Sequence, residues 1–362
     1  MAAGLQSELK YKRDMNNLDS HIIGKNTTLK DALIGLNQLG KESLTLFVVD
    51  SNNTMIGTLT DGDIRRKLVE GISLSTPVEE VMNKSFKYIV ERKKDVRLIH
   101  EFKQMGITLL PCLDDENKIV DLYDLKNNLS ILPIDAVLMA GGKGERLRPL
   151  TKKMPKPLLP INNKAIIDHN IERLITYGIK HISVTVNYMK KEIEQHFSKE
   201  YNGIKIQCIP EPKFLGTIGS IKYVEIFYND IVLVMNSDLF TNINYEEFYL
   251  HFIEEKADMA VAVTPYLVSI PYGIVELDKQ YIKNIKEKPT YSYYINAGMY
   301  LVRKELLSLI PDDTYFNATD LITLFIQRRL KIIRYPITGY WIDIGKMDDY
   351  EKAIDLAKHI KQ

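Results

Sequence analysis

The sequence has little of what secreted, disulfide-bonded or membrane-spanning proteins need. Only two of its 362 residues are cysteine, Cys112 and Cys208, and each lies in an apolar stretch without another cysteine or a histidine at metal-ligand spacing. This excludes a disulfide framework and favours a reducing compartment. No stretch reaches the roughly 18 uninterrupted apolar residues of a membrane helix, and residues 1–14 have no apolar core of a signal peptide. We therefore expect a cytoplasmic protein that does not enter a membrane.

Excess charge of either sign is also absent. Lys and Arg number 48 against 47 Asp and Glu, a net charge of +1, so the chain has no bulk basic field to bind nucleic acid. Any anionic ligand must be held by a local site.

The length of 362 residues exceeds that of one compact domain, so we expect two folded cores. A composition of 45% apolar and 26% charged residues is ordinary for a globular protein.

The first third of the chain predicts two similar α/β units in tandem. A helical stretch at 28–40 is followed by a strand at 44–50, a turn, a strand at 55–60 and a helix that begins near 61. The same order returns more weakly between residues 93 and 127. We assign residues 16–72 and 73–130 to the two repeats, and residues 1–15 to a flexible N-terminus.

Residues 131–362 predict an α/β domain with a Rossmann-like, mostly parallel sheet. Apolar strands at 135–140, 181–188, 231–238 and 259–265 alternate with amphipathic helices, as expected when helices cover both faces of the sheet. Segments 272–278, 281–289 and 295–302 predict shorter mixed strands, which we expect to form walls around a ligand at one end of the sheet.

The strongest chemical signal follows the first of these strands. Gly141, Gly142 and Gly144 allow the backbone to approach phosphates closely, since glycine has no Cβ and tolerates positive φ. Four cations surround the turn, namely Lys143, Arg146, Arg148 and Lys156. The spacing matches neither the P-loop nor the dinucleotide-binding fingerprint, so an ordinary NTPase and a nicotinamide enzyme are not indicated.

The run GGKGERLRPLT, followed by MPKPLLPI, resembles the signature of the sugar-1-phosphate nucleotidyltransferases (NDP-sugar pyrophosphorylases). The resemblance covers about residues 133–362 and implies a GT-A-like fold that joins a nucleoside triphosphate to a sugar 1-phosphate with Mg²⁺. It implies catalytic roles for Arg146 and Lys156, which would neutralise phosphate charge during an in-line displacement. It also implies that the nucleotide contacts Leu138, Ala140, Gly141, Gly142, Gly144, Glu211, Gly216 and Thr217.

Two aspartates match the magnesium ligands of that family. Asp238 ends an apolar strand in NSD, and Asp343 stands in WIDIG. Two carboxylates with phosphate oxygens and water suit Mg²⁺. Taken alone, Asp238 could instead cap the following helix.

For the sugar, the resemblance implies contacts from Gly273, Glu287 and Asn296 to hydroxyls, and from Lys288 to the sugar phosphate.

The sequence defines the base of the nucleotide less well. Glu211 stands where pyrimidine-specific relatives commonly have Gln, and a carboxylate can accept hydrogen bonds from guanine N1–H and its amino group. This favours GTP, although a surface glutamate in a loop is equally consistent.

The segment MIGTLTDGDIRRKL resembles a CBS domain, in which Thr60 and Asp63 would hold the ribose and phosphate of AMP or ATP. In the second repeat Tyr123 and Lys126 stand at these positions, so we expect at most one competent site. The alternative is an Asp63 that only caps a helix.

A CBS pair before such a transferase resembles the enzymes proposed to make GDP-glucosamine from glucosamine 1-phosphate for legionaminic-acid-type sugars, and adenine nucleotides would regulate it. Mannose 1-phosphate with GTP, and glucose 1-phosphate with dTTP or UTP, are alternatives. Other classes are a polyol-phosphate cytidylyltransferase and an inactive, nucleotide-sensing regulatory subunit. Both families commonly self-associate, so we expect a homo-oligomer.

Overall fold

A computed structural model describes residues 18–40, 44–92 and 94–360. The predicted flexible segment 1–15 lies outside these residues. The chain divides into two compact units, Met1–Ile131 and Leu132–Gln362. Within the described residues, no helix combines the length and the apolar character needed to cross a bilayer.

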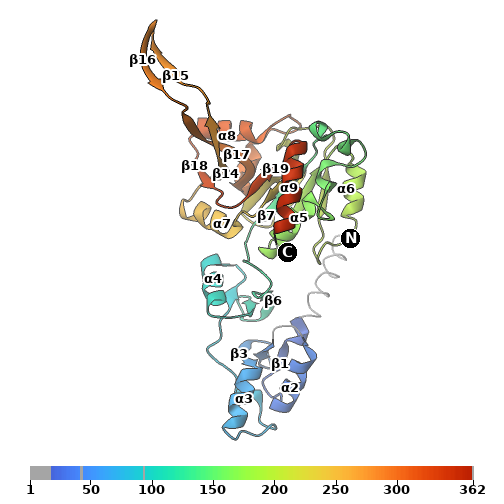
Figure 1. The fold of residues 1–362 in the computed structure, drawn as a ribbon. Helices are drawn as coiled ribbons and strands as arrows, with labels where there is room; N and C mark the ends of the chain where they lie inside the picture. Colours follow the sequence, from blue (N-terminus) through green and yellow to red (C-terminus); the bar gives the residue numbers. More distant parts are fainter. Residues whose placement is uncertain (1–17, 41–43, 93, 361–362) are drawn as a thin grey trace. The chain divides into compact units, whose positions relative to one another are not determined.

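The first half of unit 1 has the predicted order of elements (Figure 1). These are β1 (Ile22–Gly24), α2 (Leu29–Gln38), β2 (Thr45–Val49), β3 (Met55–Thr60) and α3 (Asp61–Val69). Strand β2 pairs in parallel with β1 and antiparallel with β3. The hydroxyl of Thr28 accepts a hydrogen bond from the Asp31 amide and caps α2, and the apolar face of that helix covers the sheet.

The second half repeats this pairing with β4 (Ile89–Val90), α4 (Val96–Gln104), β5 (Leu109–Leu113) and β6 (Ile119–Asp124). In the described residues no helix follows β6. Instead, the Asp124 carboxylate accepts hydrogen bonds from the amides of Lys126 and Asn127 and closes a turn. Lysine at 126 cannot accept a backbone hydrogen bond as Asp63 does in the first half, so the capping arrangement is lost.

The two halves share a core. Phe47 and Met55 from the first half cluster with Leu109 and Leu113 from the second, and all four are buried. Thr54 also forms a β-bridge with Lys118. Unit 1 is therefore one packed pair of repeats.

Unit 2 is built on a seven-stranded sheet in the order β11-β10-β7-β12-β17-β14-β18. The strands are β7 (Asp135–Ala140), β10 (Ile182–Val186), β11 (Gln207–Pro210), β12 (Ile231–Asn236), β14 (Met259–Ser269), β17 (Thr290–Arg303) and β18 (Ile332–Pro336). Only β17 runs antiparallel to its neighbours, which confirms the predicted mostly parallel sheet.

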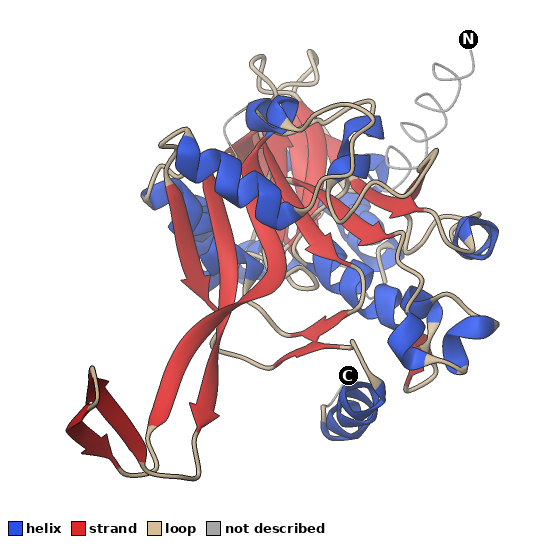
Figure 2. Ribbon diagram, turned by 90° about the horizontal axis from the view of Figure 1, so that it is seen from above, coloured by secondary structure: helices blue, strands red, loops and turns tan. Residues whose placement is uncertain are grey.

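Helices cover both faces of this sheet (Figure 2). They are α5 (Ile166–Thr176), α6 (Lys190–His196), α7 (Tyr245–Glu254), α8 (Ala318–Gln327) and α9 (Met347–His359). One face packs Val232, Val234 and Val302 against Leu321 and Phe325 of α8. Because the central strands are buried on both faces, their sequences are continuously apolar. Strands β7 and β12 pair in parallel, so their carboxyl ends lie side by side at one edge of the sheet.

Segments 272–278 and 281–289 form strands, as predicted, and their role as walls around a ligand stays a prediction. They form an isolated hairpin of β15 (Ile274–Asp278) and β16 (Tyr281–Lys286), which projects away from the sheet on the extended ends of β14 and β17 (Figures 1 and 2). Strand patterns fix the local conformation, whereas the direction of this hairpin depends on how far β14 and β17 continue.

Candidate active site

The glycine turn after β7 is tightly built. A Cβ on Gly141 would lie 2.7 Å from Glu211 Oε1, so a larger residue there would displace the Glu211 carboxylate. Gly144 has φ +60°, and a Cβ on it would lie 3.0 Å from side-chain atoms of both Lys156 and Thr151. The Thr151 hydroxyl donates to the Gly144 carbonyl at 2.8 Å. These contacts fix the turn against the segment that contains Lys156.

A pocket opens at this edge of the sheet. The structure places eight of the predicted site residues along its wall: Ala140, Gly141, Gly142, Lys156, Glu211, Gly216, Thr217 and Asp238. Sequence reasoning missed Met139, Pro157, Phe214, Asn236 and Ser237, which also line it. Each is a close sequence neighbour of a predicted residue. The strand ends at this edge were a signal for Met139, Asn236 and Ser237, whereas no strand end marks Pro157 and Phe214.

Leu138 and Arg146 lie outside that lining. Leu138 is fully buried in the middle of β7, between β10 and β12, so its side chain belongs to the core. The Arg146 guanidinium approaches Gly345, where a Cβ would lie 3.1 Å from Nη2. The absence of a side chain at Gly345 therefore makes room for Arg146 beside the strand that contains Asp343.

The structure brings the two predicted metal ligands together. Short strands β13 (Leu239–Thr241) and β19 (Trp341–Asp343) pair antiparallel, with Leu239 opposite Asp343. The Ile344 amide donates to the Asp238 carbonyl at 3.2 Å. Burial and the neighbouring Asp238 carboxylate raise the pKa of Asp343, while the charges of Lys156 and Arg146 act in the opposite direction.

Lys156 completes this cluster. Its ammonium forms an ion pair with Asp238 Oδ2, and both side chains are largely buried. The other oxygen, Asp238 Oδ1, is buried without a hydrogen-bond partner among the described residues. An orphaned carboxylate oxygen next to a second aspartate is what a bound cation would satisfy, so these residues fit Mg²⁺.

Glu211 is a buried group, which removes the interpretation of a surface glutamate. It is 6% exposed, and Oε2 accepts hydrogen bonds from the Leu215 amide at 3.3 Å and from Asn187 Nδ2 at 3.5 Å. Burial raises the pKa of its carboxyl, although hydrogen bonds from Leu215, Ser220 and Asn187 partly offset this. Glu211 thus presents a desolvated carboxyl at the pocket wall.

The turn at Gly216 and Thr217 is fixed to the start of α8. Gly216 has φ +81°, and a Cβ would meet the Phe316 carbonyl at 2.6 Å. The Thr217 amide donates to Asn317 Oδ1 at 3.3 Å, and its hydroxyl accepts from the Ala318 amide at 2.9 Å. Phe316 and Asn317 support the pocket, and no local pattern indicated them.

The predicted sugar-binding residues divide into two groups. Asn296 of β17 is linked to the pocket through Gly298, whose amide donates to Asn296 Oδ1 at 2.9 Å. Gly298 packs against Asn236 of the pocket lining, since a Cβ on it would lie 2.5 Å from Asn236 Nδ2. Asn296 donates to the Tyr300 hydroxyl at 2.8 Å. Glu287 and Lys288 instead lie on the hairpin, outside the pocket lining.

Gly273 shares the position of these two residues. A Cβ on Gly273 would lie 3.0 Å from Glu287 Oε2, so the structure does bring that predicted pair together. Both lie at the base of the β15–β16 hairpin.

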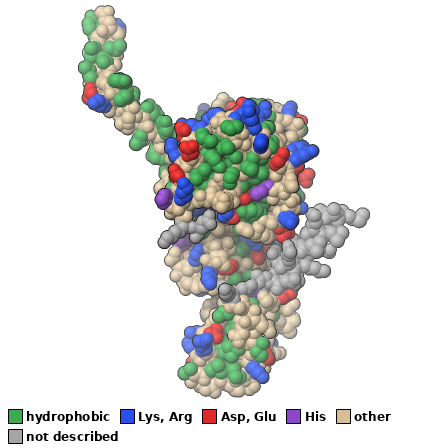
Figure 3. All heavy atoms as spheres, turned by 45° about the vertical axis from the view of Figure 1, so that its right-hand side comes forward, with side chains coloured by type: hydrophobic (Ala, Val, Ile, Leu, Met, Phe, Trp, Pro, Cys, Tyr) green, Lys and Arg blue, Asp and Glu red, His purple; other side chains and the backbone are tan. Residues whose placement is uncertain are grey.

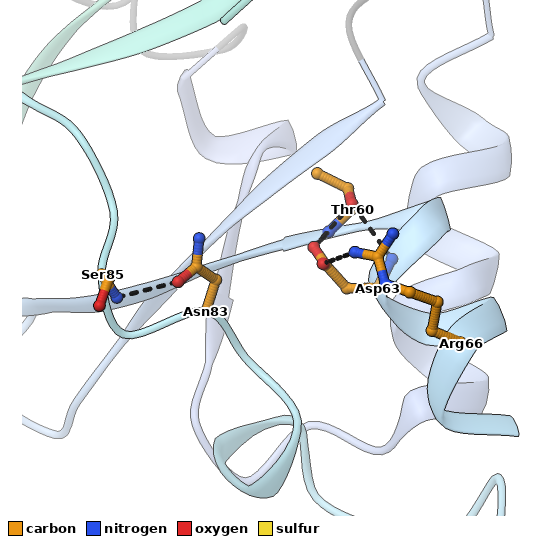
Figure 4. A network of polar contacts seen from close by, with 5 residues as sticks. All are labelled: Thr60, Asp63, Arg66, Asn83 and Ser85. Carbon is orange, nitrogen blue, oxygen red and sulfur yellow. Dashed lines mark hydrogen bonds and ion pairs between the residues drawn. The ribbon is translucent and has the colours of Figure 1, made fainter. Parts of the chain in front are cut away.

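In unit 1, Thr60 and Asp63 form a capping box at the start of α3 (Figure 4). Asp63 Oδ2 accepts from the Thr60 amide at 2.9 Å and from its hydroxyl at 2.6 Å, while Oδ1 accepts from Arg66 at 2.5 Å. Asp63 therefore does help to cap this helix. A nucleotide would have to share or replace these hydrogen bonds.

Comparison with protein families decides the classification. The family described as nucleotidyl transferase matches residues 135–359, and the CBS domain family matches residues 13–70. The chain belongs to the nucleotidyl transferase family. This confirms the predicted combination of a nucleotidyltransferase domain with a CBS domain ahead of it.

Relatives in the nucleotidyl transferase family are named for the transfer of different nucleotidyl groups. The chain is 30% identical over 230 residues to the D-glycero-alpha-D-manno-heptose 1-phosphate guanylyltransferase of Aneurinibacillus thermoaerophilus, covering 62% of this chain and 99% of that protein. It is also 30% identical over 251 residues to the UTP–glucose-1-phosphate uridylyltransferase of Synechocystis, covering 62% and 64% respectively. These relatives support a sugar-1-phosphate nucleotidyltransferase and leave the base and sugar open.

A solved structure supports the fold alone. The UDP-glucose pyrophosphorylase from Acinetobacter baumanii aligns with a TM-score of 0.50 at 19% identity, covering 64% of this chain and 95% of that chain.

Proposed function

We propose that this chain transfers a guanylyl group from GTP to glucosamine 1-phosphate and releases pyrophosphate. The observation that carries the proposal is the cluster of Lys156, Asp238 and Asp343 beside a pocket lined by the glycine turn. Anion-binding backbone, cations and a carboxylate pair are the parts that nucleotidyl transfer requires.

The reaction needs no protein nucleophile. An oxygen of the sugar phosphate forms a bond to the α-phosphorus of the triphosphate, and the bond from that phosphorus to the bridging oxygen breaks as pyrophosphate leaves. Backbone amides of the glycine turn would bind the phosphates, while Arg146 and Lys156 neutralise their charge. Mg²⁺, held by Asp238 and Asp343, would supply further charge neutralisation when bound.

Glu211 supports the choice of GTP. A buried carboxyl at the pocket wall can accept from the N1–H and amino group of guanine, whereas uracil and thymine present two acceptors that would face it. The partial desolvation of Glu211 strengthens such a hydrogen bond. On the sugar side, Asn296 would position a hydroxyl.

A panel of four triphosphates against hexose, heptose and glucosamine 1-phosphates tests this function. With Mg²⁺ present, we expect pyrophosphate release to be fastest with GTP and glucosamine 1-phosphate, and to stop on chelation of the metal. Faster release with dTTP or UTP would overturn the assignment of the base. Mannose 1-phosphate as the best acceptor would overturn that of the sugar, and no release with any pair would overturn the enzyme.

We further propose that AMP or ATP binds at Thr60 and Asp63 and changes the rate of transfer. A nucleotide offers hydroxyl and phosphate groups that can replace the capping hydrogen bonds of Asp63 and pair with Arg66. Any such regulation requires that the nucleotide bind two states of the chain with different affinities.

The cytoplasmic location stays a prediction.

Asp63→Ala tests this regulatory site. We expect adenine-nucleotide affinity to fall about tenfold, the equivalent of one charge-assisted hydrogen bond, with basal transfer unchanged. Isothermal titration calorimetry measures the affinity. Asp61→Ala is the matched control, since Asp61 lies in the same first turn and pairs with Arg65. Equal binding by the Asp63 variant and the wild type would contradict the proposal.

A further inference from the structure

Glu211 is a buried carboxyl whose partners are all uncharged. On the face of unit 2 drawn in Figure 3, acidic side chains lie at the surface beside lysines and arginines. Glu211 is only 6% exposed, and it accepts hydrogen bonds from the Leu215 amide and from the side chains of Asn187 and Ser220. Burial raises the pKa of this carboxyl, because a buried carboxylate is more costly than the neutral acid.

The groups around Glu211 accommodate both the ionised and the neutral carboxyl. Oε2 accepts from the Leu215 amide at 3.3 Å and from Asn187 Nδ2 at 3.5 Å, and it still accepts when a proton is bound to Oε1. The Ser220 hydroxyl, on the 3-10 helix Gly219–Tyr223, can turn to donate or to accept. Protonation of Glu211 therefore leaves these buried donors satisfied.

The charged and titratable groups near Glu211 have other partners. Across the pocket, Lys156 and Asp238 pair with each other. The hydrogen bond from Tyr223 to Asp313 raises the pKa of that tyrosine, and the charge of Glu211 acts in the same direction. The remaining charged side chains of the adjoining turns are exposed, except that Lys222 is partly buried and pairs with Asp312: Lys143, Glu145, Lys213 and Lys222. Within the described residues, no cation thus pairs with Glu211 to hold it ionised.

Oε1 is the oxygen of Glu211 that is placed to meet a base. Oε2 is held by protein donors, whereas Oε1 lies against the glycine turn, 2.7 Å from the position of a Cβ on Gly141. Gly141 and Glu211 both line the pocket. The protonation of Oε1 therefore decides whether the pocket wall presents an acceptor or a donor at this point.

The two states of Oε1 suit different bases. Ionised Oε1 accepts hydrogen bonds, and guanine offers N1–H and an amino group as donors. Protonated Oε1 donates a hydrogen bond, and uracil and thymine offer O4 as an acceptor. The wrong combination places two acceptors or two donors opposite each other and loses a buried hydrogen bond.

We propose that Glu211 makes the choice of base depend on pH, so that the chain transfers guanylyl groups when Glu211 is ionised and uridylyl or thymidylyl groups when it is protonated. The inference rests on the function proposed above, since it needs a nucleoside triphosphate in this pocket. The second activity uses the same displacement at the α-phosphorus, and only the contact to the base changes. GTP binding then releases a proton from Glu211, whereas UTP binding takes one up.

Proton exchange on binding tests this inference without turnover. GTP and UTP are titrated into the chain by isothermal titration calorimetry with Mg²⁺ and without sugar phosphate, in two buffers of different ionisation enthalpy. The pH lies between the ordinary pKa of glutamate and neutrality. We expect GTP to release more protons than UTP, because protons exchanged by the triphosphate itself are common to both and cancel in the difference.

Two variants assign this difference to Glu211. Glu211→Gln keeps the shape of the side chain and should abolish the difference in proton number, whereas Glu225→Gln, at an exposed carboxyl, should keep it. Equal proton numbers for GTP and UTP in the wild type, or an unchanged difference in Glu211→Gln, would overturn the inference.

Competition between two substrates tests the second activity. Equal amounts of GTP and UTP are mixed with glucosamine 1-phosphate, and the ratio of GDP-sugar to UDP-sugar is measured from about pH 5 to about pH 8. General effects of pH on the enzyme cancel in this ratio. We expect the ratio to fall about tenfold as the pH falls, the scale of one hydrogen bond to a charged group, and to stay low at every pH in Glu211→Gln.

The two measurements separate this inference from the proposed function. A wild-type product ratio that does not change with pH would overturn the inference and leave the transferase activity standing. Transfer from neither triphosphate would overturn the proposed function, while calorimetry would still report whether Glu211 exchanges a proton with the bound base.

Discussion

The two sides of the candidate site are built in different ways. The triphosphate side lies at the carboxyl ends of β7 and β12, and Gly141, Gly144 and Gly216 each fit where a Cβ would contact a neighbouring group. On the sugar side, Glu287 and Lys288 are exposed at the base of the β15–β16 hairpin, outside the pocket lining. The first side is therefore preorganised by the core, whereas the second depends on the position of this hairpin.

The largest effect is expected from the preorganised side. Asp238→Asn keeps the shape of the side chain but removes the charge that pairs with Lys156 and that would hold Mg²⁺. We expect kcat to fall about 1,000-fold, the scale of losing one electrostatic contact at a transition state. Steady-state pyrophosphate release measures this. Asp348→Asn, an exposed position at the start of α9, is the control, and equal rates for all three proteins would remove Asp238 from the site.

Substitutions of two glycines in the same turn test whether the turn is strained. Gly144→Ala forces a positive φ on alanine and crowds Lys156, so we expect a loss of about 1–2 kcal/mol in unfolding free energy. We also expect roughly 100-fold lower kcat/KM for the triphosphate, because the turn is displaced. A Cβ on Gly142 meets nothing within 4 Å, so Gly142→Ala should keep its stability. Denaturant unfolding compares the stabilities of the two variants, and steady-state kinetics compares their kcat/KM. Equal stabilities of Gly144→Ala and Gly142→Ala would argue against a strained turn.

The sugar side is expected to respond differently. Lys288→Ala should raise the KM for the sugar phosphate about 10–30-fold, the scale of one charge-assisted hydrogen bond, and leave that for the triphosphate unchanged. Lys283→Ala, on the same hairpin, is the matched control. If both KM values rise together in Lys288→Ala, the separation of the site into two independent sides is incorrect.

Sequence reasoning located the groups of the first side because local patterns place them. The apolar run of β12 ends at Asn236, so Asp238 had to lie just beyond the carboxyl edge of a strand. The partnership of Asp238 with Asp343 came from family resemblance, since it depends on the nonlocal pairing of β13 with β19. The burial of Glu211 could not be predicted, because the flanking Pro210 and Pro212 are typical of an exposed loop. In space, Asn187 and Leu215 donate hydrogen bonds to its carboxylate.

The β15–β16 hairpin shows the opposite limit. Its strands were predicted as short mixed strands, but such a pattern is compatible with a wall of the site and with a projecting hairpin. The second repeat of unit 1 shows the same limit of sequence-based prediction on a smaller scale. Its similarity to the first repeat did not reveal that a turn at Asp124 replaces the helix. In both cases contacts remote in sequence decide the outcome.

The smallest effect concerns stability on the preorganised side. Burial and Asp238 raise the pKa of Asp343 above its ordinary value of 3.8, so the folded state favours the neutral acid. The stability that this contributes is complete below the unfolded-state pKa and is lost as the pH rises through the raised pKa. At pH 7 without Mg²⁺, Asp343→Asn should therefore raise Tm by about 2 °C.

Added Mg²⁺ should reverse this order, because a cation bound to both aspartates stabilises only the folded wild type. Differential scanning calorimetry with and without Mg²⁺ measures both differences. Asp355→Asn is the control, since Lys358 lowers the pKa of that exposed carboxyl and no like charge opposes its ionisation. If Mg²⁺ raises Tm equally in the wild type and in Asp343→Asn, the ion binds elsewhere.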